Sequence, residues 1–345
     1  MRELQQLHEP FELWSTAQHV TGVAETLADL AIPAADLELV RSGATSHITK
    51  SLQVPPWMLR IAAYAVRNRR ELRRRLRSGG SRGVVVVHGD TFSTVLGALL
   101  GRFLGARVAH VEAGLRTGSL RNPFPEEANR RIVAKLATIH FAPTEREVRN
   151  LKAERVRGEI IETGANTVVD ALRLAEHEDV DVELPPVFGL VTLHRFELLR
   201  QAGQFEAILR TLAEHRHAVP LVMVAGKSER DRITELGLDP LFDADFRLID
   251  KRPYAAFLPI LVRAHFVVTD SGGLQEECAV LGIPCAVHRE RTERYQGIGE
   301  NVLLTRMDTA VLSSFLGDTE AYRRPSTLDR YEPSRIIASQ LVGDL

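Results

Sequence analysis

The chain has 345 residues and a formal net charge of −1; 44% of its residues are hydrophobic and 26% are charged. This length suits two domains better than one, and the composition is typical of a globular protein with a full apolar core. The balanced charge excludes a general electrostatic attraction to nucleic acid or to an anionic membrane surface.

Three features bear on the cellular compartment. No part of the sequence approaches the roughly 18 consecutive apolar residues that a membrane-spanning helix needs. The N-terminal residues are charged and lack the apolar core of a signal peptide. Cys278 and Cys285 can pair in principle, but so few cysteines favour reduced thiols. We therefore expect a cytoplasmic protein with no membrane partner.

In the first half of the chain, short apolar runs alternate with amphipathic patterns. Strands are predicted at residues 11–16, 83–88, 106–111, 138–142 and 159–162, and helices at residues 23–30, 94–104, 125–136, 145–153 and 168–176. The run of four valines that ends at His88 is typical of a strand buried on both faces. The alternation predicts a parallel, doubly wound sheet.

An acidic segment that ends in two prolines, residues 176–186, is predicted to be a linker. The alternation then resumes, with strands at residues 189–193, 220–225, 246–249, 266–269 and 284–287 and a helix at residues 204–215. The predicted fold class is therefore α/β, with two Rossmann-like domains facing a cleft, and ligands are expected at the carboxyl ends of the strands. The expected domains are residues 1–175 and 186–330, and residues 331–345 are expected to form a helix that packs back on the N-terminal domain.

Residues 67–77 carry seven arginines. A nucleic-acid patch is one interpretation, but no aromatic residues are interleaved to stack on bases. A helix with Leu72 and Leu76 on a buried stripe and the arginines on a solvated face is favoured. We therefore expect no nucleic-acid partner.

Carboxylates follow two predicted strands and open a predicted helix in the N-terminal domain. Asp90 follows the first of these strands, where it can equally cap the next helix. Glu112 follows the second strand, where it can pair with Arg116 instead of acting on a ligand. Glu126 or Glu127 opens a helix whose positive end is by itself a sufficient reason for either residue. Carboxylates gathered in this way can take different pKa values, as acid–base chemistry requires.

The second domain contains a candidate anion site. Thr269-Asp270-Ser271-Gly272-Gly273 joins a predicted strand to a helix, and its glycines let a phosphate approach the free backbone N–H groups. Many loops contain Ser-Gly-Gly, so the prediction depends on its position after a buried strand. Glu277, one turn further, is placed to hold ribose hydroxyls. His194 and Arg195 end another strand, either as structural residues or as contacts to a diphosphate or a sugar.

Together these pieces resemble the non-hydrolysing UDP-N-acetylglucosamine 2-epimerases, whose GT-B fold has two facing Rossmann-like domains. The resemblance runs from about Phe11 to the C-terminus. Its blocks are His88-Gly89-Asp90-Thr91, His110-Val111-Glu112-Ala113-Gly114-Leu115-Arg116-Thr117-Gly118, Pro123-Phe124-Pro125-Glu126-Glu127-Ala128-Asn129-Arg130-Arg131 and Thr269-Asp270-Ser271-Gly272-Gly273-Leu274-Gln275-Glu276-Glu277.

The resemblance implies which residues act and what they do. The implied catalytic residues are Asp90, Glu112, Glu126 and His194. Substrate contacts are expected from Arg116, Arg195, Ser271, Gly272, Gly273, Glu277 and Arg294. The implied reaction inverts C2 of the sugar, by anti elimination of UDP to a 2-acetamidoglucal and re-addition on the other face. The resemblance implies a UDP-sugar substrate, no metal, nicotinamide or other cofactor, and a homodimer.

Several blocks depart from the family pattern. The family's first strand and its Gly-Thr-Arg-Pro-Glu loop have no counterpart here. Two interpretations stay open: the start of the sequence is misplaced, or the N-terminal domain is incomplete and has a slot in its sheet. The family's His-Arg-Arg-Glu-Asn block reads His194-Arg195-Phe196-Glu197-Leu198, and its Thr-Glu-Arg-Pro-Glu block reads Thr292-Glu293-Arg294-Tyr295-Gln296. The family's activator site includes a His-Asn-Pro-Asn stretch that is absent here, so activation by substrate is not expected.

The main functional prediction is a UDP-N-acetylglucosamine 2-epimerase that interconverts UDP-GlcNAc and UDP-ManNAc. Two alternatives remain open at this point. One is a hydrolysing relative that releases N-acetylmannosamine and UDP. The other is a homologue that binds sugar nucleotides without turnover.

Overall fold

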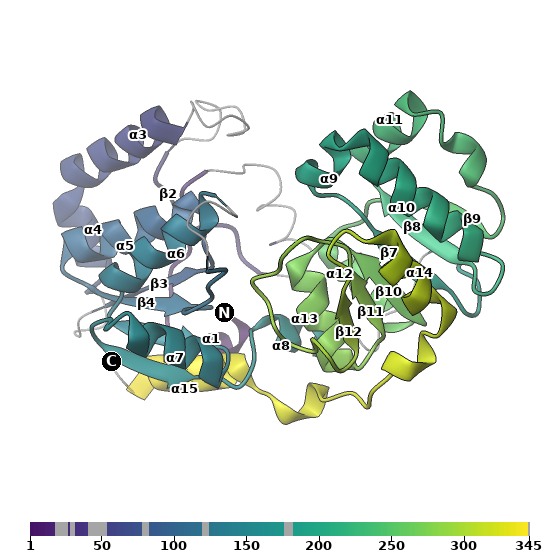
Figure 1. The fold of residues 1–345 in the computed structure, drawn as a ribbon. Helices are drawn as coiled ribbons and strands as arrows, with labels where there is room; N and C mark the ends of the chain where they lie inside the picture. Colours follow the sequence, from purple (N-terminus) through teal and green to yellow (C-terminus); the bar gives the residue numbers. More distant parts are fainter. Residues whose placement is uncertain are drawn as a thin grey trace. The chain divides into compact units, whose positions relative to one another are not determined.

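The structure is a computed structural model that describes residues 1–17, 27, 32–40, 54–77, 83–118, 124–175 and 182–343. The chain folds into two compact units, Met1–Thr167 with Glu332–Leu345, and Val168–Tyr331 (Figure 1). Apart from Leu27, the predicted helix at residues 23–30 lies outside the described residues, as does most of the predicted linker.

None of the helices in the described parts of the chain is both long and apolar enough to cross a membrane.

The first unit is built on a parallel sheet with the strand order β3-β4-β5-β6. Its strands are β3 (Val84–His88), β4 (Arg107–Val111), β5 (Ile139–Ala142) and β6 (Glu159–Glu162), and a separate parallel pair joins β1 (Trp14–Ser15) to β2 (Leu37–Glu38). Its helices are α1 (Arg2–Gln6), α3 (Val54–Arg67), α4 (Arg69–Arg75), α5 (Phe92–Leu104), α6 (Glu126–Leu136), α7 (Glu145–Ala153) and α15 (Pro333–Gly343).

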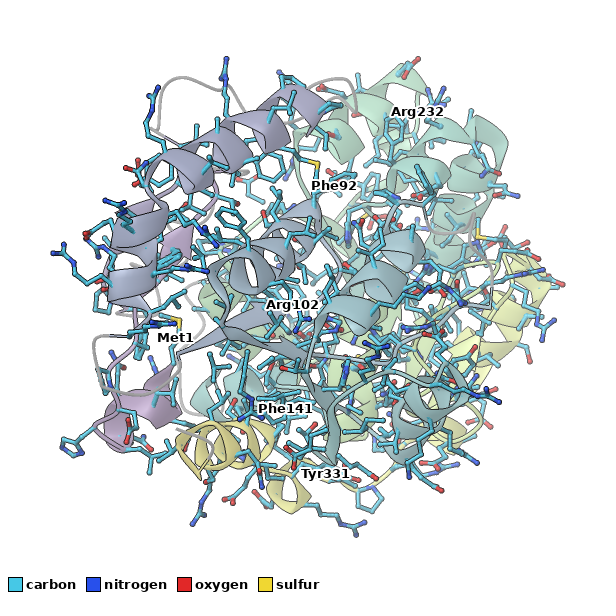
Figure 2. All side chains as sticks on the ribbon, turned by 90° about the vertical axis from the view of Figure 1, so that its left-hand side faces the viewer. Met1, Phe92, Arg102, Phe141, Arg232 and Tyr331 are labelled. Atoms are coloured by element: carbon cyan, nitrogen blue, oxygen red, sulfur yellow. The ribbon has the colours of Figure 1, made fainter. Side chains whose placement is uncertain are left out.

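The core of this unit lies on both faces of the sheet, because successive side chains of a strand point to opposite sides. Val108 packs in a buried cluster with Val133 of α6 and with residues of α5. Ala109 and Phe141 pack in another cluster with Ile337 of α15. Helices α5 and α6 therefore cover one face and α15 the other (Figure 1; Phe141 is labelled in Figure 2).

Strand β3 is the edge of the sheet among the described strands, with β4 as its neighbour. Val86 at its centre is 46% exposed, and His88 at its end is also exposed. The prediction that this valine run is buried on both faces is therefore wrong for the described structure. A run of β-branched residues predicts a strand, but burial also depends on what covers each face.

The arginine-rich helix α4 packs through its leucines, as the favoured interpretation predicted. Leu72 is fully buried, and Leu76 packs against the same cluster. Arg73 donates from Nε to the carbonyl oxygen of Leu104 at 3.0 Å, and Arg75 pairs with Glu12 at 3.2 Å. The arginines thus have protein partners on a largely solvated face.

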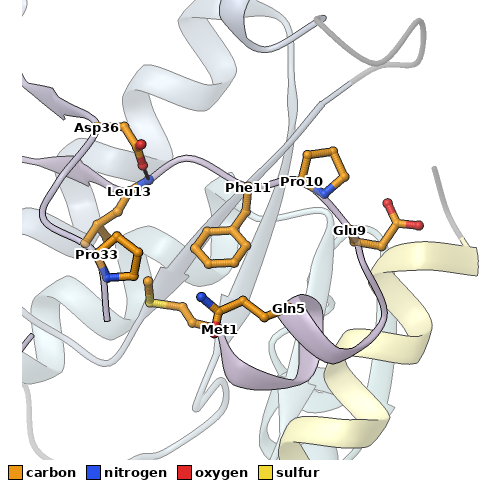
Figure 3. A pocket seen from close by; sticks show the side chains of 8 residues that line it. All are labelled: Met1, Gln5, Glu9, Pro10, Phe11, Leu13, Pro33 and Asp36. Carbon is orange, nitrogen blue, oxygen red and sulfur yellow. Dashed lines mark hydrogen bonds between the residues drawn. The ribbon is translucent and has the colours of Figure 1, made fainter. Parts of the chain in front are cut away.

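A cavity of about 260 Å³ lies between the N-terminal segment and the segment before β2. Met1, Phe11 and Leu13 supply apolar lining, and Asp36 accepts a hydrogen bond from the backbone N–H of Leu13 at 2.7 Å (Figure 3). None of the residues that line this cavity belongs to the predicted site.

The second unit is built on a parallel sheet with the strand order β12-β11-β10-β7-β8-β9. The strands are β7 (Gly189–Thr192), β8 (Leu221–Ala225), β9 (Phe246–Asp250), β10 (Phe266–Thr269), β11 (Cys285–Val287) and β12 (Val302–Leu304). The α-helices are α8 (Val168–Ala175), α9 (Phe196–Arg200), α10 (Ala202–His215), α11 (Lys227–Glu235), α12 (Tyr254–Val262), α13 (Gly272–Leu281) and α14 (Thr309–Gly317). Short 3-10 helices occur at Asp239–Leu241, Glu320–Tyr322 and Leu328–Arg330. Two parallel-sheet units confirm the predicted α/β class.

Helix α8 belongs to the second unit, although the sequence placed it in the first domain. It packs against α12 and α13, and Arg173 Nη2 donates to the carbonyl oxygen of Leu328 at 2.7 Å. The compact units divide before α8, at Val168, whereas the sequence placed the division after α8, where the acidic segment begins. Cys278 and Cys285 are buried free thiols in this unit.

Candidate functional site

The carboxyl ends of β3 and β4 lie side by side, because His88 is paired in register with Val111. The backbone N–H of Gly89 donates to the carbonyl oxygen of Val111 at 3.2 Å. Glu112 follows β4 directly, and its Oε2 lies 3.4 Å from His88 Nε2. The loops that carry Asp90 and Glu112 are therefore neighbours at one edge of the sheet, as the sequence predicted.

Glu112 has an unusual backbone conformation. Its φ of 68° lies in the left-handed region, which costs a non-glycine residue about 1 kcal/mol or more. Its side chain is only 9% exposed. Backbone strain at a largely buried carboxylate that ends a strand is typical of a residue whose position matters for function.

Asp90 is not the cap of α5. Thr91 occupies the N-cap, and its hydroxyl accepts a hydrogen bond from the backbone N–H of Thr94. The Asp90 carboxylate instead accepts from Arg130 Nη2 at 2.6 Å, and the Asp90 carbonyl oxygen accepts from Asn129 Nδ2 at 2.8 Å. The interpretation of Asp90 as a helix cap is therefore wrong, because its carboxylate makes no capping hydrogen bond to α5.

The two glutamates at the start of α6 have different surroundings. Glu127 is fully buried and accepts from the backbone N–H of Thr117 at 3.2 Å and from Arg131 Nε at 3.1 Å. Glu126 has one buried carboxylate oxygen, Oε2, with no hydrogen-bond partner in the described part of the chain. Glu127 is therefore held by hydrogen bonds within the fold, whereas one oxygen of Glu126 lacks a partner among the described residues.

Arg116 is occupied by a structural partner. Its Nε and Nη2 donate to the two carboxylate oxygens of Glu154 at 2.7 and 2.8 Å, and its Nη1 donates to the carbonyl oxygen of Leu115. The Arg116 guanidinium holds the pKa of Glu154 below its usual range. This bidentate geometry favours a structural role for Arg116 over the predicted substrate contact.

His110 contacts the loop that carries Asp90. Its Nε2 lies 2.8 Å from the carbonyl oxygen of Gly89, and the ring is fully buried. Burial lowers the pKa of His110 to about 4, so the ring is neutral at neutral pH and donates from Nε2. His140, its neighbour across β4 and β5, is also fully buried.

In the second unit, Asp270 joins the ends of two adjacent strands. It is 1% exposed and accepts from the backbone N–H of His194 at 3.1 Å and of Arg195 at 2.8 Å. His194 Nδ1 also lies 3.4 Å from Asp270 Oδ1. Burial raises the pKa of Asp270, and the His194 side chain and these backbone amides act in the opposite direction. Asp270 thus orients a histidine whose ring is 47% exposed.

The predicted anion site forms the start of α13. Ser271 is the N-cap, and its hydroxyl accepts from the backbone N–H of Leu274 at 3.4 Å. Gly272 is enclosed, because a Cβ there would lie 2.8 Å from Glu293 Oε1. Gly273 has more room, because a Cβ there would lie 3.8 Å from Ser271 Oγ, which is ordinary van der Waals contact. Because Gly272 and Gly273 have no side chains, a ligand can approach the backbone of the first turn closely. The N–H groups of a first helical turn suit an anion.

Glu277 lies one turn further along α13. One oxygen, Oε1, accepts from the Tyr254 hydroxyl at 2.7 Å, and Oε2 is buried without a hydrogen-bond partner among the described residues. Burial raises the pKa of Glu277 to about 7. This oxygen is suited to accept a ligand hydroxyl, which agrees with the predicted ribose contact.

Arg294 lies beside the same turn but is engaged with the protein. It forms an ion pair with Glu276, and its carbonyl oxygen accepts from Gln275 Nε2 at 3.0 Å. Its Cγ lies 3.3 Å from the position of a Cβ at Gly272. Its side chain therefore lies against the predicted anion site.

Comparison with known proteins identifies the family. A family model described as UDP-N-acetylglucosamine 2-epimerase matches residues 78–322. The chain belongs to this family. The UDP-N-acetylglucosamine 2-epimerases of Yersinia pestis and Bacillus subtilis are each 37% identical, over 267 and 288 residues. These matches cover 70% and 75% of this chain and 69% and 72% of the relatives.

A solved structure agrees with this membership. The UDP-GlcNAc 2-epimerase of Neisseria meningitidis, bound to UDP-GlcNAc, has a TM-score of 0.74 and 27% identity. The match covers 94% of this chain and 90% of that chain.

In this epimerase-family chain, sequence reasoning missed four residues that support the site: His110, Arg130, Tyr254 and Asp270. The signal for Arg130 is its spacing of three and four residues from Glu127 and Glu126, which places all three on neighbouring turns of α6. No comparable local signal exists for Tyr254. Among the described residues, no group of three or more His, Cys, Asp or Glu side chains is arranged to hold a metal ion.

Proposed function

We propose that this protein interconverts UDP-GlcNAc and UDP-ManNAc by inverting C2 of the sugar. The observation that carries the proposal is that Glu112 adjoins the loop of Asp90 at the ends of β3 and β4, and that Asp90 is held by Arg130 of α6, the helix that Glu126 opens. Its support from comparison is family membership and the names of the relatives from Yersinia pestis and Bacillus subtilis. A UDP-sugar substrate is supported by the Neisseria meningitidis structure, which holds UDP-GlcNAc.

The carboxylates suit the proton transfers that this inversion needs. No carbonyl group acidifies the C2 proton, so cleavage of the C1–O bond must lead. The electrons of that bond leave with UDP while a carboxylate accepts the C2 proton, which gives a 2-acetamidoglucal. In the second half, a proton returns to C2 on the opposite face and UDP adds back to C1. Acid–base pairs of this kind contribute about 10²- to 10⁴-fold to a rate.

The second unit supplies groups that suit the leaving UDP. The backbone N–H groups of the first turn of α13 stabilise anionic oxygens as negative charge develops on the diphosphate. Glu277 Oε2 is available to a ribose hydroxyl, and we assign His194, held by Asp270, to the sugar diphosphate. These roles are consistent with the burial of Glu277 and Asp270 and with the hydrogen bonds that Asp270 accepts from His194 and Arg195.

The reaction in D₂O tests this function. We expect NMR to show UDP-ManNAc formed from UDP-GlcNAc, with deuterium at C2 of both sugars, because the C2 proton exchanges with solvent through a carboxylate. Free N-acetylmannosamine with UDP would instead indicate a hydrolysing enzyme. Binding of UDP-GlcNAc without either product would indicate a homologue without turnover.

A homodimer and a cytoplasmic location complete the proposal. The homodimer is supported by exposed apolar side chains on α5 and α6, including Leu99 at 43%, Phe103 at 39% and Ile132 at 45% exposure. Light scattering on a size-exclusion column measures the mass directly. The cytoplasmic location is supported by the two free thiols, and cell fractionation tests it.

A further inference from the structure

Arg289 is a buried arginine to which the sequence patterns assigned no role. It lies two residues after β11 and is 8% exposed. Burial, as the largest cause, lowers the pKa of Arg289. Arginine is rarely buried unless its charge is paired, so its donors need partners.

The hydrogen bonds of Arg289 are incomplete. Its Nη2 donates to Glu293 Oε2 at 3.1 Å. Its Nη1 is buried and has no hydrogen-bond partner in the described part of the chain. A structural ion pair with Glu293 provides an acceptor for Nη2 but none for Nη1. A buried cationic donor without an acceptor is costly, which indicates that a ligand completes it.

The unpartnered atom points to the first turn of α13. Arg289 Nη1 lies 3.4 Å from the position that a Cβ of Gly272 would take. Helix α13 begins at Gly272 and has ten residues, and Ser271 Oγ caps the N–H of its third residue, Leu274. The N–H groups of Gly272 and Gly273 lie at the positive end of the helix without an acceptor inside it. Two independent donor sets therefore converge on one place.

The nearby charges favour an anion at this place. The positive charge of Arg195 lowers the pKa of Arg289, so the two guanidinium groups repel each other. Glu293 and Asp270 raise the pKa of Arg289 and offset part of this repulsion. An anion bound between the start of α13 and Arg289 would offset the remaining repulsion between the two guanidinium groups.

We propose that Arg289 binds the diphosphate of the UDP group at the first turn of α13. This inference rests on the proposed function and deepens it. Nη1 donates to a phosphate oxygen, while Nη2 remains on Glu293, which acts as the positioning residue for the guanidinium. The fixed positive charge stabilises the diphosphate most when the C1–O bond is broken. Arg289 is thus a substrate-binding residue whose contribution grows in the transition state.

Calorimetric binding of UDP and of uridine to Arg289→Gln tests the inference. We expect UDP affinity to fall about 10- to 100-fold, because a charge-assisted contact is lost, while uridine affinity stays within about twofold. Arg291→Gln is the matched control, since Arg291 is an exposed arginine two residues away, and it should bind UDP as the wild type does. In turnover, Arg289→Gln should lower kcat as well as raise KM.

The outcomes separate the inference from the function on which it rests. An Arg289→Gln protein that binds UDP as tightly as an active wild type overturns the inference alone. Equal losses for UDP and uridine also overturn it, because they indicate structural damage. A wild type that binds no UDP contradicts the proposed function itself. Should Arg289→Gln fail to fold, Arg289→Lys decides: a loss of about threefold or more for UDP alone supports the contact, and unchanged UDP affinity contradicts it.

Discussion

The Arg130 guanidinium donates to the Asp90 carboxylate at 2.6 Å and joins the start of α6 to the loop after β3. Arg130 is 4% exposed and also lies 3.5 Å from Glu127 Oε2. The side chain of Asp90 remains 25% exposed. One buried cation therefore fixes a proposed catalytic carboxylate and leaves part of it accessible to a substrate.

Arg130→Gln should reduce kcat about 10- to 100-fold and change KM less than about threefold, because Asp90 loses its fixed position. The free energy of unfolding should fall by about 3 kcal/mol, since the change leaves two carboxylates without a buried cation. Steady-state kinetics on the folded fraction measures the first effect. Arg130→Lys should recover part of kcat, and a folded Arg130→Gln protein with wild-type kcat would exclude a positioning role.

Glu126→Gln and Glu127→Gln should have opposite effects on turnover and on stability. Glu126→Gln should lower turnover about 10³-fold with little change in stability, because it removes an acid–base group whose Oε2 lacks a partner. Glu127→Gln should cost about 2 kcal/mol of stability, because it weakens the hydrogen bonds to Arg130 and Arg131. Its turnover should stay within about tenfold of wild type. Thermal unfolding and turnover measurements on both variants test these expectations. If Glu127→Gln lost turnover and Glu126→Gln lost stability, Glu127 would be the catalytic residue and Glu126 the structural one.

The secondary structure of the α/β units followed closely from the sequence where local patterns are strong. Strand β10 (Phe266–Thr269) and helix α7 (Glu145–Ala153) were predicted to the residue, because an apolar run or an amphipathic period ends at a turn or cap signal. Helix α12 was not predicted. It is apolar around much of its circumference and contains Pro259, so it lacks a helical period.

The supporting side chains of the site could not be predicted because their partners are distant in the sequence. Arg130 lies 40 residues from Asp90, and Asp270 lies 76 residues from His194. The positions of Asp90 and Glu112 at strand ends were accessible to sequence reasoning. Their hydrogen bonds depend on the register of β3 with β4 and on the docking of α6, which no local pattern encodes.

Glu112→Gly should abolish turnover without lowering stability. Glycine adopts a φ of 68° freely, so relief of strain should offset the lost contacts and leave stability equal or about 1 kcal/mol higher. Glu112→Gln keeps the strained backbone and should also be inactive, with UDP affinity within about twofold of wild type. Denaturant unfolding and calorimetry measure these quantities. An active Glu112→Gln protein would remove Glu112 from the catalytic set.

The raised pKa of Glu277 predicts that the free energy of unfolding depends on pH. Burial raises its pKa from 4.5 to about 7, so the folded chain binds a proton that the unfolded chain releases between these values. The stabilisation is fully present below pH 4.5 and is lost as the pH rises through 7. The difference in unfolding free energy between wild type and Glu277→Gln should therefore fall by about 3 kcal/mol between pH 4.5 and pH 8.

The comparison of these two proteins isolates Glu277 from other titrating groups. The pKa of His110 is lowered to about 4, so His110 destabilises the fold as the pH falls below 6.5, in wild type and variant alike. Tyr254→Phe removes a hydrogen bond that lowers the pKa of Glu277, so it should move the loss of stability to higher pH. Urea unfolding at half-unit steps of pH measures all three proteins. A wild-type and Glu277→Gln difference that is constant from pH 4.5 to 8 would show that Glu277 titrates alike in the folded and unfolded chains.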